Sequence, residues 1–197
     1  MKTLAIERQF GSGGREIGRI VSQTANLPYY DSELLRRAAR AQGVPVDVLE
    51  ACDEQRTGSL LYDIVAYTDA AQYPANRTVY ELFDGLTHTV QQLHRSGPVV
   101  FVGRCTTEIL REEKNVLRVF VYASDPADRL RRTMLTEGVG EREALRLMEK
   151  KDRQRRSYFK YWTQKEWLDR NNYDLELNTS ALSPDACARI LLTAMSA

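Results

Sequence analysis

The sequence has few cysteines and no long apolar run, and each scarcity excludes a class of protein. Its three cysteines, Cys52, Cys105 and Cys187, are widely spaced and form no Cys-x-x-Cys pair. We therefore expect neither a disulfide framework nor a zinc site. No apolar run approaches the roughly 20 residues that a transmembrane helix needs, and the first residues do not resemble a secretory signal. The expected location is a reducing cytoplasm, away from membranes.

The chain also lacks an excess of either charge. It has 28 Lys and Arg residues against 27 Asp and Glu residues, so its formal net charge is +1. Such a balance provides no basic field to attract nucleic acid or an anionic membrane, and small-molecule partners are expected. Hydrophobic residues make up 43% of the 197 positions, which is enough to form the core of one domain.

Short apolar runs alternate with helical patterns along the chain, and this order predicts the fold class. The expected strands are residues 3–6, 27–30, 98–103, 116–122 and 173–178. The expected helices are residues 15–25, 33–42, 106–113, 125–136, 141–158 and 183–195, with Ser32, Ser124 and Ser183 as caps. Buried strands separated by helices are typical of an α/β three-layer fold with a parallel sheet.

A glycine-rich turn, Gly11-Ser12-Gly13-Gly14, lies between the first expected strand and the first expected helix. Glycine adopts the positive φ angles that let successive N–H groups point inward, and the helix that follows adds its dipole. The pattern therefore predicts a phosphate-binding loop. The usual P-loop continues with Lys and Ser or Thr, whereas Arg15 and Glu16 follow here. We expect a nucleotide-phosphate site with altered chemistry.

A dinucleotide-binding loop is the competing interpretation. Its fingerprint is Gly-x-Gly-x-x-Gly, with an acidic residue further on that binds the ribose. Gly11 and Gly13 fit the first two positions, and Asp31 lies near the expected acid, but Glu16 occupies the third glycine position.

Four blocks of sequence occur in the order that is typical of the cytidylate kinase-like family of P-loop nucleoside monophosphate kinases. They are residues 6–18, 27–32, 101–104 and 173–180. The resemblance implies a P-loop NTPase fold, use of ATP with Mg²⁺, and phosphoryl transfer to a nucleoside monophosphate such as CMP or dCMP. It also implies a single domain, with a core of residues 1–44, 95–136 and 171–197, a helical acceptor-binding region of residues 45–94, and a lid of residues 137–170.

The resemblance leaves two alignments of the phosphate loop open. Without a gap, Gly14 stands where cytidylate kinases have the loop lysine; with a gap of one residue, Arg15 stands there. Arg8 and Arg15 are both candidates to replace the lysine, because a guanidinium can bind two phosphate oxygens. Glu16 either binds Mg²⁺ or faces solvent in the first turn of the helix, where the dipole favours a carboxylate.

The resemblance also assigns residues to the acceptor site. Asp31 and Ser32 match the pair that opens the monophosphate site, and Arg37 matches an arginine that binds the monophosphate. Arg104 follows a buried strand, where open α/β sheets bind their ligands. Cys105 stands where the family has Asp, which weakens the expectation of cytidine selectivity; a small buried packing residue is its expected role.

The expected lid is rich in basic residues. From residue 128 to residue 156 there are ten Lys or Arg and six Asp or Glu. Arg153, Arg155 and Arg156 are the candidates to stabilise the transferred phosphoryl group, although such a run is also typical of a solvated helix face. The aromatic segment 157–162 and Trp167 form a docking surface for the lid or a homodimer patch; stacking on a nucleotide base is the alternative.

The main hypothesis is therefore an ATP-dependent nucleoside monophosphate kinase. Catalysis would consist of positioning and charge neutralisation, because the acceptor phosphate is already anionic. Two alternatives remain open. The missing lysine and Ser/Thr favour a nucleotide-binding regulatory protein without kinase activity, whereas Cys105 favours a kinase with a non-nucleotide acceptor.

Overall fold

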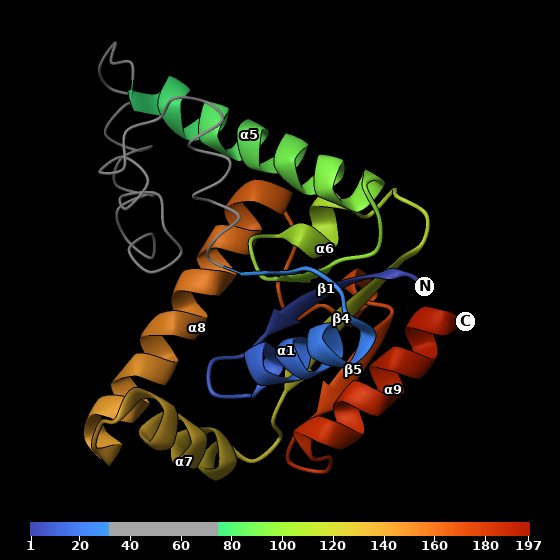
Figure 1. The fold of residues 1–197 in the computed structure, drawn as a ribbon. Helices are drawn as coiled ribbons and strands as arrows, with labels where there is room; N and C mark the ends of the chain where they lie inside the picture. Colours follow the sequence, from blue (N-terminus) through green and yellow to red (C-terminus); the bar gives the residue numbers. More distant parts are fainter. Residues whose placement is uncertain (32–74) are drawn as a thin grey trace.

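The computed structural model describes residues 1–31 and 75–197, which include a parallel β-sheet flanked by helices (Figure 1). The sheet has five strands in the order β2-β3-β1-β4-β5, and every neighbouring pair is parallel. The strands are β1 (Thr3–Arg8), β2 (Tyr29–Tyr30), β3 (Val100–Val102), β4 (Val116–Tyr122) and β5 (Leu175–Asn178). Parallel strands require crossover connections, and helices supply them.

The helices of the described residues cover both faces of the sheet (Figure 1). They are α1 (Gly14–Ala25), α5 (Ala75–Arg95), α6 (Thr106–Ile109), α7 (Pro126–Glu137), α8 (Glu141–Thr163), the 3₁₀ helix η1 (Arg170–Asn172) and α9 (Pro184–Ser196). α1 and α9 pack on one face, and α5, α6 and the C-terminal part of α8 cover the other. We call α7 and α8, which pack on each other, the α7–α8 arm.

Alternation along the strands divides the core into two layers. Leu4, Ile6 and Val119 belong to the apolar cluster under α1 and α9. Phe101 and Phe120 point the other way, into clusters with α5 and α8. Because both faces are covered, the strands are apolar at nearly every position, as expected for a parallel sheet.

The α/β class predicted from the sequence is confirmed, and so are several element boundaries. β4 spans the predicted residues 116–122, and Ser183 caps α9 by accepting a hydrogen bond from the Ala186 N–H. The predicted cap at Ser124 is wrong, because Asp125 caps α7 instead. The N–H of Ser124 donates to the side chain of Asn178. The helix predicted at 33–42, with its cap, lies outside the described residues.

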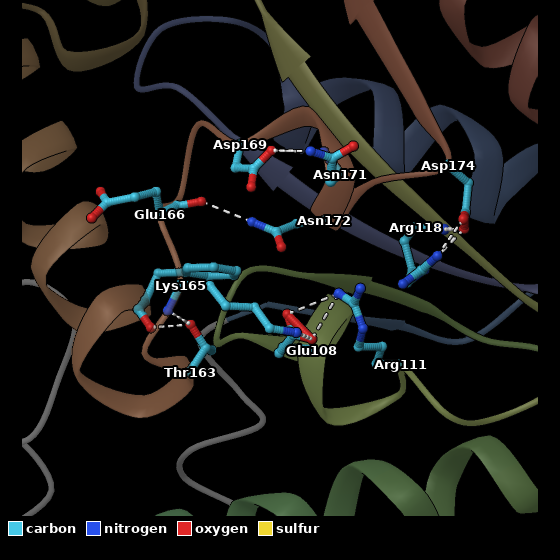
Figure 2. Close-up of polar contacts among 11 residues, drawn as sticks. Glu108, Arg111, Arg118, Thr163, Lys165, Glu166, Asp169, Asn171, Asn172 and Asp174 are labelled. Carbon is cyan, nitrogen blue, oxygen red and sulfur yellow. Dashed lines mark hydrogen bonds and ion pairs between the residues drawn. The ribbon is translucent and has the colours of Figure 1, made fainter.

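Side-chain contacts anchor the segment that leads from α8 to β5 (Figure 2). Lys165 forms an ion pair with Glu108 of α6, at 2.6 Å, and Asn172 donates to the main-chain oxygen of Glu166. Asp174 accepts hydrogen bonds from the main chain and the guanidinium of Arg118. Partial burial raises the pKa of Asp174, but these hydrogen bonds outweigh it and leave that pKa below its usual value. None of the described helices is long and apolar enough to cross a membrane.

Candidate functional site

The glycine loop, residues 9–13, joins the end of β1 to α1 and lies at the carboxyl edge of the sheet. Gly11 and Gly13 have φ angles of 74° and 85°, which L-residues with a side chain rarely adopt. The turn is closed by Ser12, whose N–H and hydroxyl both donate to the main-chain oxygen of Gln9. The loop therefore has the conformation that the glycines predicted.

The N-terminus of α1 follows this loop without a side-chain cap, since its N-cap is Gly13. The first N–H groups of a helix have no partner within the helix, and an anion can accept from them. A pocket of about 650 Å³ opens at this point. Five arginines line it, Arg8, Arg15, Arg19, Arg132 and Arg155, against two carboxylates, Glu16 and Glu137. The pocket thus favours a polyanion.

Arg8 is buried beneath the loop, with 5% of its surface exposed. Its guanidinium occupies the space next to Gly103, where an added Cβ would lie 2.1 Å from Nη1. Its side chain also passes close to Gly14, whose Cβ would lie 2.7 Å from the Cβ of Arg8. The two glycines therefore make room for a buried cation between β1, β3 and α1.

The turn after β3 combines backbone strain with burial. Gly103, Arg104 and Cys105 all have positive φ angles, of 81°, 63° and 56°. Such conformations of non-glycine residues require support from their surroundings. Here Thr106 donates its hydroxyl to the main-chain oxygen of Gly103, and Arg104 is buried at the edge that the resemblance assigned to the acceptor.

Arg15 and Asp31 lie together on the outer side of the loop. The side chain of Arg15 is about half exposed, and its Nε lies 3.4 Å from Oδ2 of Asp31. Tyr29 approaches the main-chain oxygen of Arg15, and burial, with the nearby Asp31 charge, raises the pKa of its hydroxyl. Glu16 is exposed at the rim of the pocket. Ser32 and Arg37 lie outside the described residues.

The three arginines predicted for the lid differ in burial and in whether they reach the pocket. Arg155 is buried, lines the pocket and donates to the main-chain oxygen of Arg8 at 3.1 Å. Arg153 is exposed and pairs with Glu149 one turn earlier on α8. Arg156 is also exposed, and neither it nor Arg153 lines the pocket. Of the three, the structure brings Arg155 alone to the glycine loop.

Two arginines of α7 that the sequence analysis did not single out also contact the loop. Nε of Arg129 donates to the main-chain oxygen of Phe10 at 2.8 Å, and Arg132 donates to that of Gly11 at 2.8 Å. Their spacing of three residues places both on one face of α7. α7 follows β4 at the carboxyl edge of the sheet. Two arginines three residues apart on such a helix are the signal that could have identified them as contacts of the glycine loop.

The aromatic segment packs inside the molecule. Tyr158, Phe159 and Trp167 are buried with Cys105, and Trp162 stacks on Phe83 of α5 at a ring distance of 3.9 Å. Cys105 thus has the packing role that was expected of it. The segment therefore packs on the core, and the lid role of residues 137–170 stays a prediction.

The site provides more for the phosphates of a magnesium-bound nucleotide than for the metal ion. The positive-φ glycines, the open helix N-terminus and the arginines fit the phosphates. Among the described residues, no group of three or more His, Cys, Asp or Glu side chains could hold a metal ion. A magnesium ion would therefore be held mainly by the phosphates, with Glu16 in the first turn of α1 as a carboxylate of the pocket that could contribute.

Known structures identify the fold as that of P-loop kinases. An uncharacterized protein from Eubacterium ventriosum is 23% identical, with a TM-score of 0.75 and coverage of 100% of this chain and 99% of that one. Shikimate kinase from Bacteroides thetaiotaomicron is 11% identical, with a TM-score of 0.54 and coverage of 100% and 99%. Shikimate kinase from Acinetobacter baumannii, solved with shikimate, is 14% identical, with a TM-score of 0.50 and coverage of 100% and 94%.

The sequence assigns the chain to a particular family within this fold. The profile of the Cytidylate kinase-like family matches residues 3–181, and the chain belongs to that family. None of the curated proteins matches it. Family and fold together support a phosphotransferase of the P-loop kinase type, and the resemblance seen in the sequence is confirmed.

Proposed function

We propose that this protein transfers the γ-phosphoryl group of MgATP to a pyrimidine nucleoside monophosphate, with CMP or dCMP as the first candidates. The observation that carries the proposal is the glycine loop, which opens into an arginine-lined pocket in a chain of the Cytidylate kinase-like family. Gly11, Gly13 and Gly14 would present main-chain N–H groups to the donor phosphates, in a loop that Ser12 closes. Magnesium would neutralise charge on the β- and γ-phosphates.

The chain's own cations would replace the missing loop lysine. Arg15 is exposed at the first turn of α1 and is free to turn from Asp31 toward a phosphate. Arg8 is buried under the loop, which suits a fixed positive charge below the phosphates. Arg155 and Arg132 would complete the positive lining from the arm. Preorganised charges of this kind stabilise a phosphoryl group in transfer without needing a general base.

The acceptor would lie beyond the turn at Gly103, near Arg104 and Asp31, with Ser32 and Arg37 as further predicted contacts. Because Cys105 is buried among aromatic side chains, it cannot offer the polar contact of the Asp that it replaces. This observation favours a second candidate function, a kinase for a small non-nucleotide acceptor. Residues 45–94 and 137–170 keep their proposed roles as acceptor region and lid.

The experiment that tests the proposal is a coupled ADP-release assay with the whole chain. MgATP is supplied with CMP, dCMP, UMP, AMP, GMP or shikimate, and a reaction without acceptor gives the background. We expect turnover well above background with a pyrimidine monophosphate. Turnover with shikimate alone would support the second candidate, and ATP binding without any turnover would point to a regulatory protein.

Arg15→Ala tests which cation replaces the lysine. We expect the affinity for MgATP to fall on the order of tenfold at low salt, and the loss to shrink at high salt, because Arg15 is exposed and screened. Isothermal titration calorimetry at two salt concentrations measures the change. Arg189→Ala, which removes an exposed charge from α9, is the control and should change nothing. Equal affinities of the two variants would exclude Arg15 from the phosphate site.

A further inference from the structure

Phe10 is the loop residue at which three charged side chains of the α7–α8 arm meet. Its N–H donates to Oδ1 of Asp152 at 2.7 Å, and its main-chain oxygen accepts from Nε of Arg129 at 2.8 Å. Arg129 and Asp152 also form an ion pair with each other. The guanidinium of Arg155 lies over the Phe10 ring, 5.4 Å from its centroid. We call Arg129 and Asp152 the Phe10 clamp.

The clamp contacts main-chain atoms of the loop, so it constrains the backbone conformation of the loop. Both polar main-chain groups of Phe10 are held, on the residue directly before Gly11, where the chain first takes a positive φ. The β1–β4 ladder ends at Arg8. Beyond it, Gln9 bonds to the main chain of β4 and of Ala123, and the Thr179 hydroxyl donates to the main-chain oxygen of Ser12, but none of these contacts is made to Phe10. Groups from the arm therefore hold the two peptide units that flank Phe10.

The clamp is more buried than two ion pairs that lie within the helices of the arm. The side chains of Arg129 and Asp152 are 13% and 16% exposed. Arg131–Asp128 on α7 and Arg153–Glu149 on α8 join neighbouring turns, and their arginines are more than 60% exposed. Exposed pairs contribute little, whereas charged hydrogen bonds in a partly buried setting contribute more. The clamp also joins segments more than 110 residues apart in sequence.

We infer that Arg129 and Asp152 are positioning residues that set the shape of the glycine loop and couple it to the α7–α8 arm. With the arm docked, the clamp orients the peptide units on both sides of Phe10 so that the N–H groups after them face a phosphate. When the arm moves away, the loop loses both contacts of Phe10. The inference rests on the proposed function in so far as the bound anion is the phosphate chain of MgATP. Figure 1 shows the loop between β1 and α1 directed toward this arm.

Hydrogen exchange of the unliganded, full-length protein tests the clamp without any ligand. Asp152→Asn keeps an acceptor for the Phe10 N–H but removes the charge that pairs with Arg129. We expect amide exchange of residues 10–14 to become about tenfold faster, as for the loss of a charged hydrogen bond, while β4 stays protected. The matched controls are Arg131→Met and Glu149→Gln, which break the exposed pairs on the same two helices. They should stay within about twofold of the wild type.

Binding and rescue separate a positioning role from a merely structural one. MgATP affinity should fall about tenfold in Asp152→Asn and stay unchanged in the controls. Arg129→Lys cannot donate to Phe10 and Asp152 with one planar group, so it should lose some affinity for MgATP. Because it keeps the positive charge, this loss should be smaller than that of Arg129→Met. The effects of Arg129→Met and Asp152→Asn should be non-additive in the double variant.

Three outcomes would overturn the inference. Loop exchange in Asp152→Asn equal to that in Glu149→Gln would show that no clamp exists. Faster exchange with unchanged affinity for MgATP would show that the clamp does not position the phosphate-binding groups. Additive effects would show that Arg129 and Asp152 act separately. Failure of the proposed function can be told apart from these outcomes. The wild type would then show no turnover with any acceptor, whereas hydrogen exchange, which needs no ligand, would still test the clamp.

Discussion

Gly103→Ala should destabilise the protein by about 2–5 kcal/mol, the sum of a strained φ and an overpacked site. The backbone at Gly103 has a φ of 81°, and the new Cβ would lie 2.1 Å from Nη1 and 2.9 Å from Cζ of Arg8. Arg8 is buried, so its guanidinium has little room to withdraw. We expect the phosphate loop to be displaced with it, because Arg8 ends the strand that leads into the loop.

Urea denaturation measures the free energy of unfolding, and Gly138→Ala is the matched control. Gly138 has a φ of 67° but no atom within 4 Å of an added Cβ, so this variant carries the backbone strain alone. It should cost about 1–2 kcal/mol. In an Arg8→Ala background, Gly103→Ala should also cost less than in the wild type, because the colliding guanidinium is gone. Equal costs at Gly103 and Gly138 would contradict the packing argument.

Trp167→Ala should lower the free energy of unfolding by about 3–5 kcal/mol, as for other large core truncations. Trp167 is 1% exposed and packs edge-on against Phe120, with ring centroids 5.2 Å apart. Its indole N–H also donates to Oε2 of Glu7 at 3.2 Å, and Glu7 is a buried carboxylate on β1. The residue therefore joins the segment after α8 to the central strand of the site.

Trp167→Phe separates the hydrogen bond from the packing. It keeps most of the ring but removes the donor to Glu7, and we expect a loss of about 1–3 kcal/mol, as for a buried charged acceptor that loses its partner. Leu168→Ala is the control, since Leu168 is about half exposed, at 47%. If Trp167→Phe were as stable as the wild type, the indole–carboxylate contact would contribute nothing.

Local sequence signals predicted the parts of the site that depend on neighbouring residues. Gly11 and Gly13 were predicted to take positive φ angles because a glycine cluster stood between a strand and a helix, and the structure confirms it. Ser183 followed by Pro184 predicted the start of α9, because serine is a common N-cap and proline is favoured at the first helical position. Asp125 before Pro126 carries the same signal for α7, so its cap could also have been predicted from the sequence.

Long-range contacts were the part that the sequence could not supply. Arg153, Arg155 and Arg156 lie within four residues of one another on α8 and look alike in sequence. Helical rotation turns Arg155 toward the loop and leaves the other two exposed. Arg129 and Arg132 were missed because their partners, Phe10 and Gly11, lie about 120 residues away along the chain.

The sequence by itself determined the α/β order of elements, the glycine loop without its lysine, and the membership of a kinase-like family. These follow from hydrophobic periodicity, glycine stereochemistry and motif order, which are properties of short segments. Only the tertiary structure decided which charges surround the loop: Arg8 beneath it, Arg132 and Arg155 beside it, and Asp152 on the Phe10 N–H. The physical reason is that the packing of the α7–α8 arm against the sheet sets these distances, and no local pattern encodes that packing.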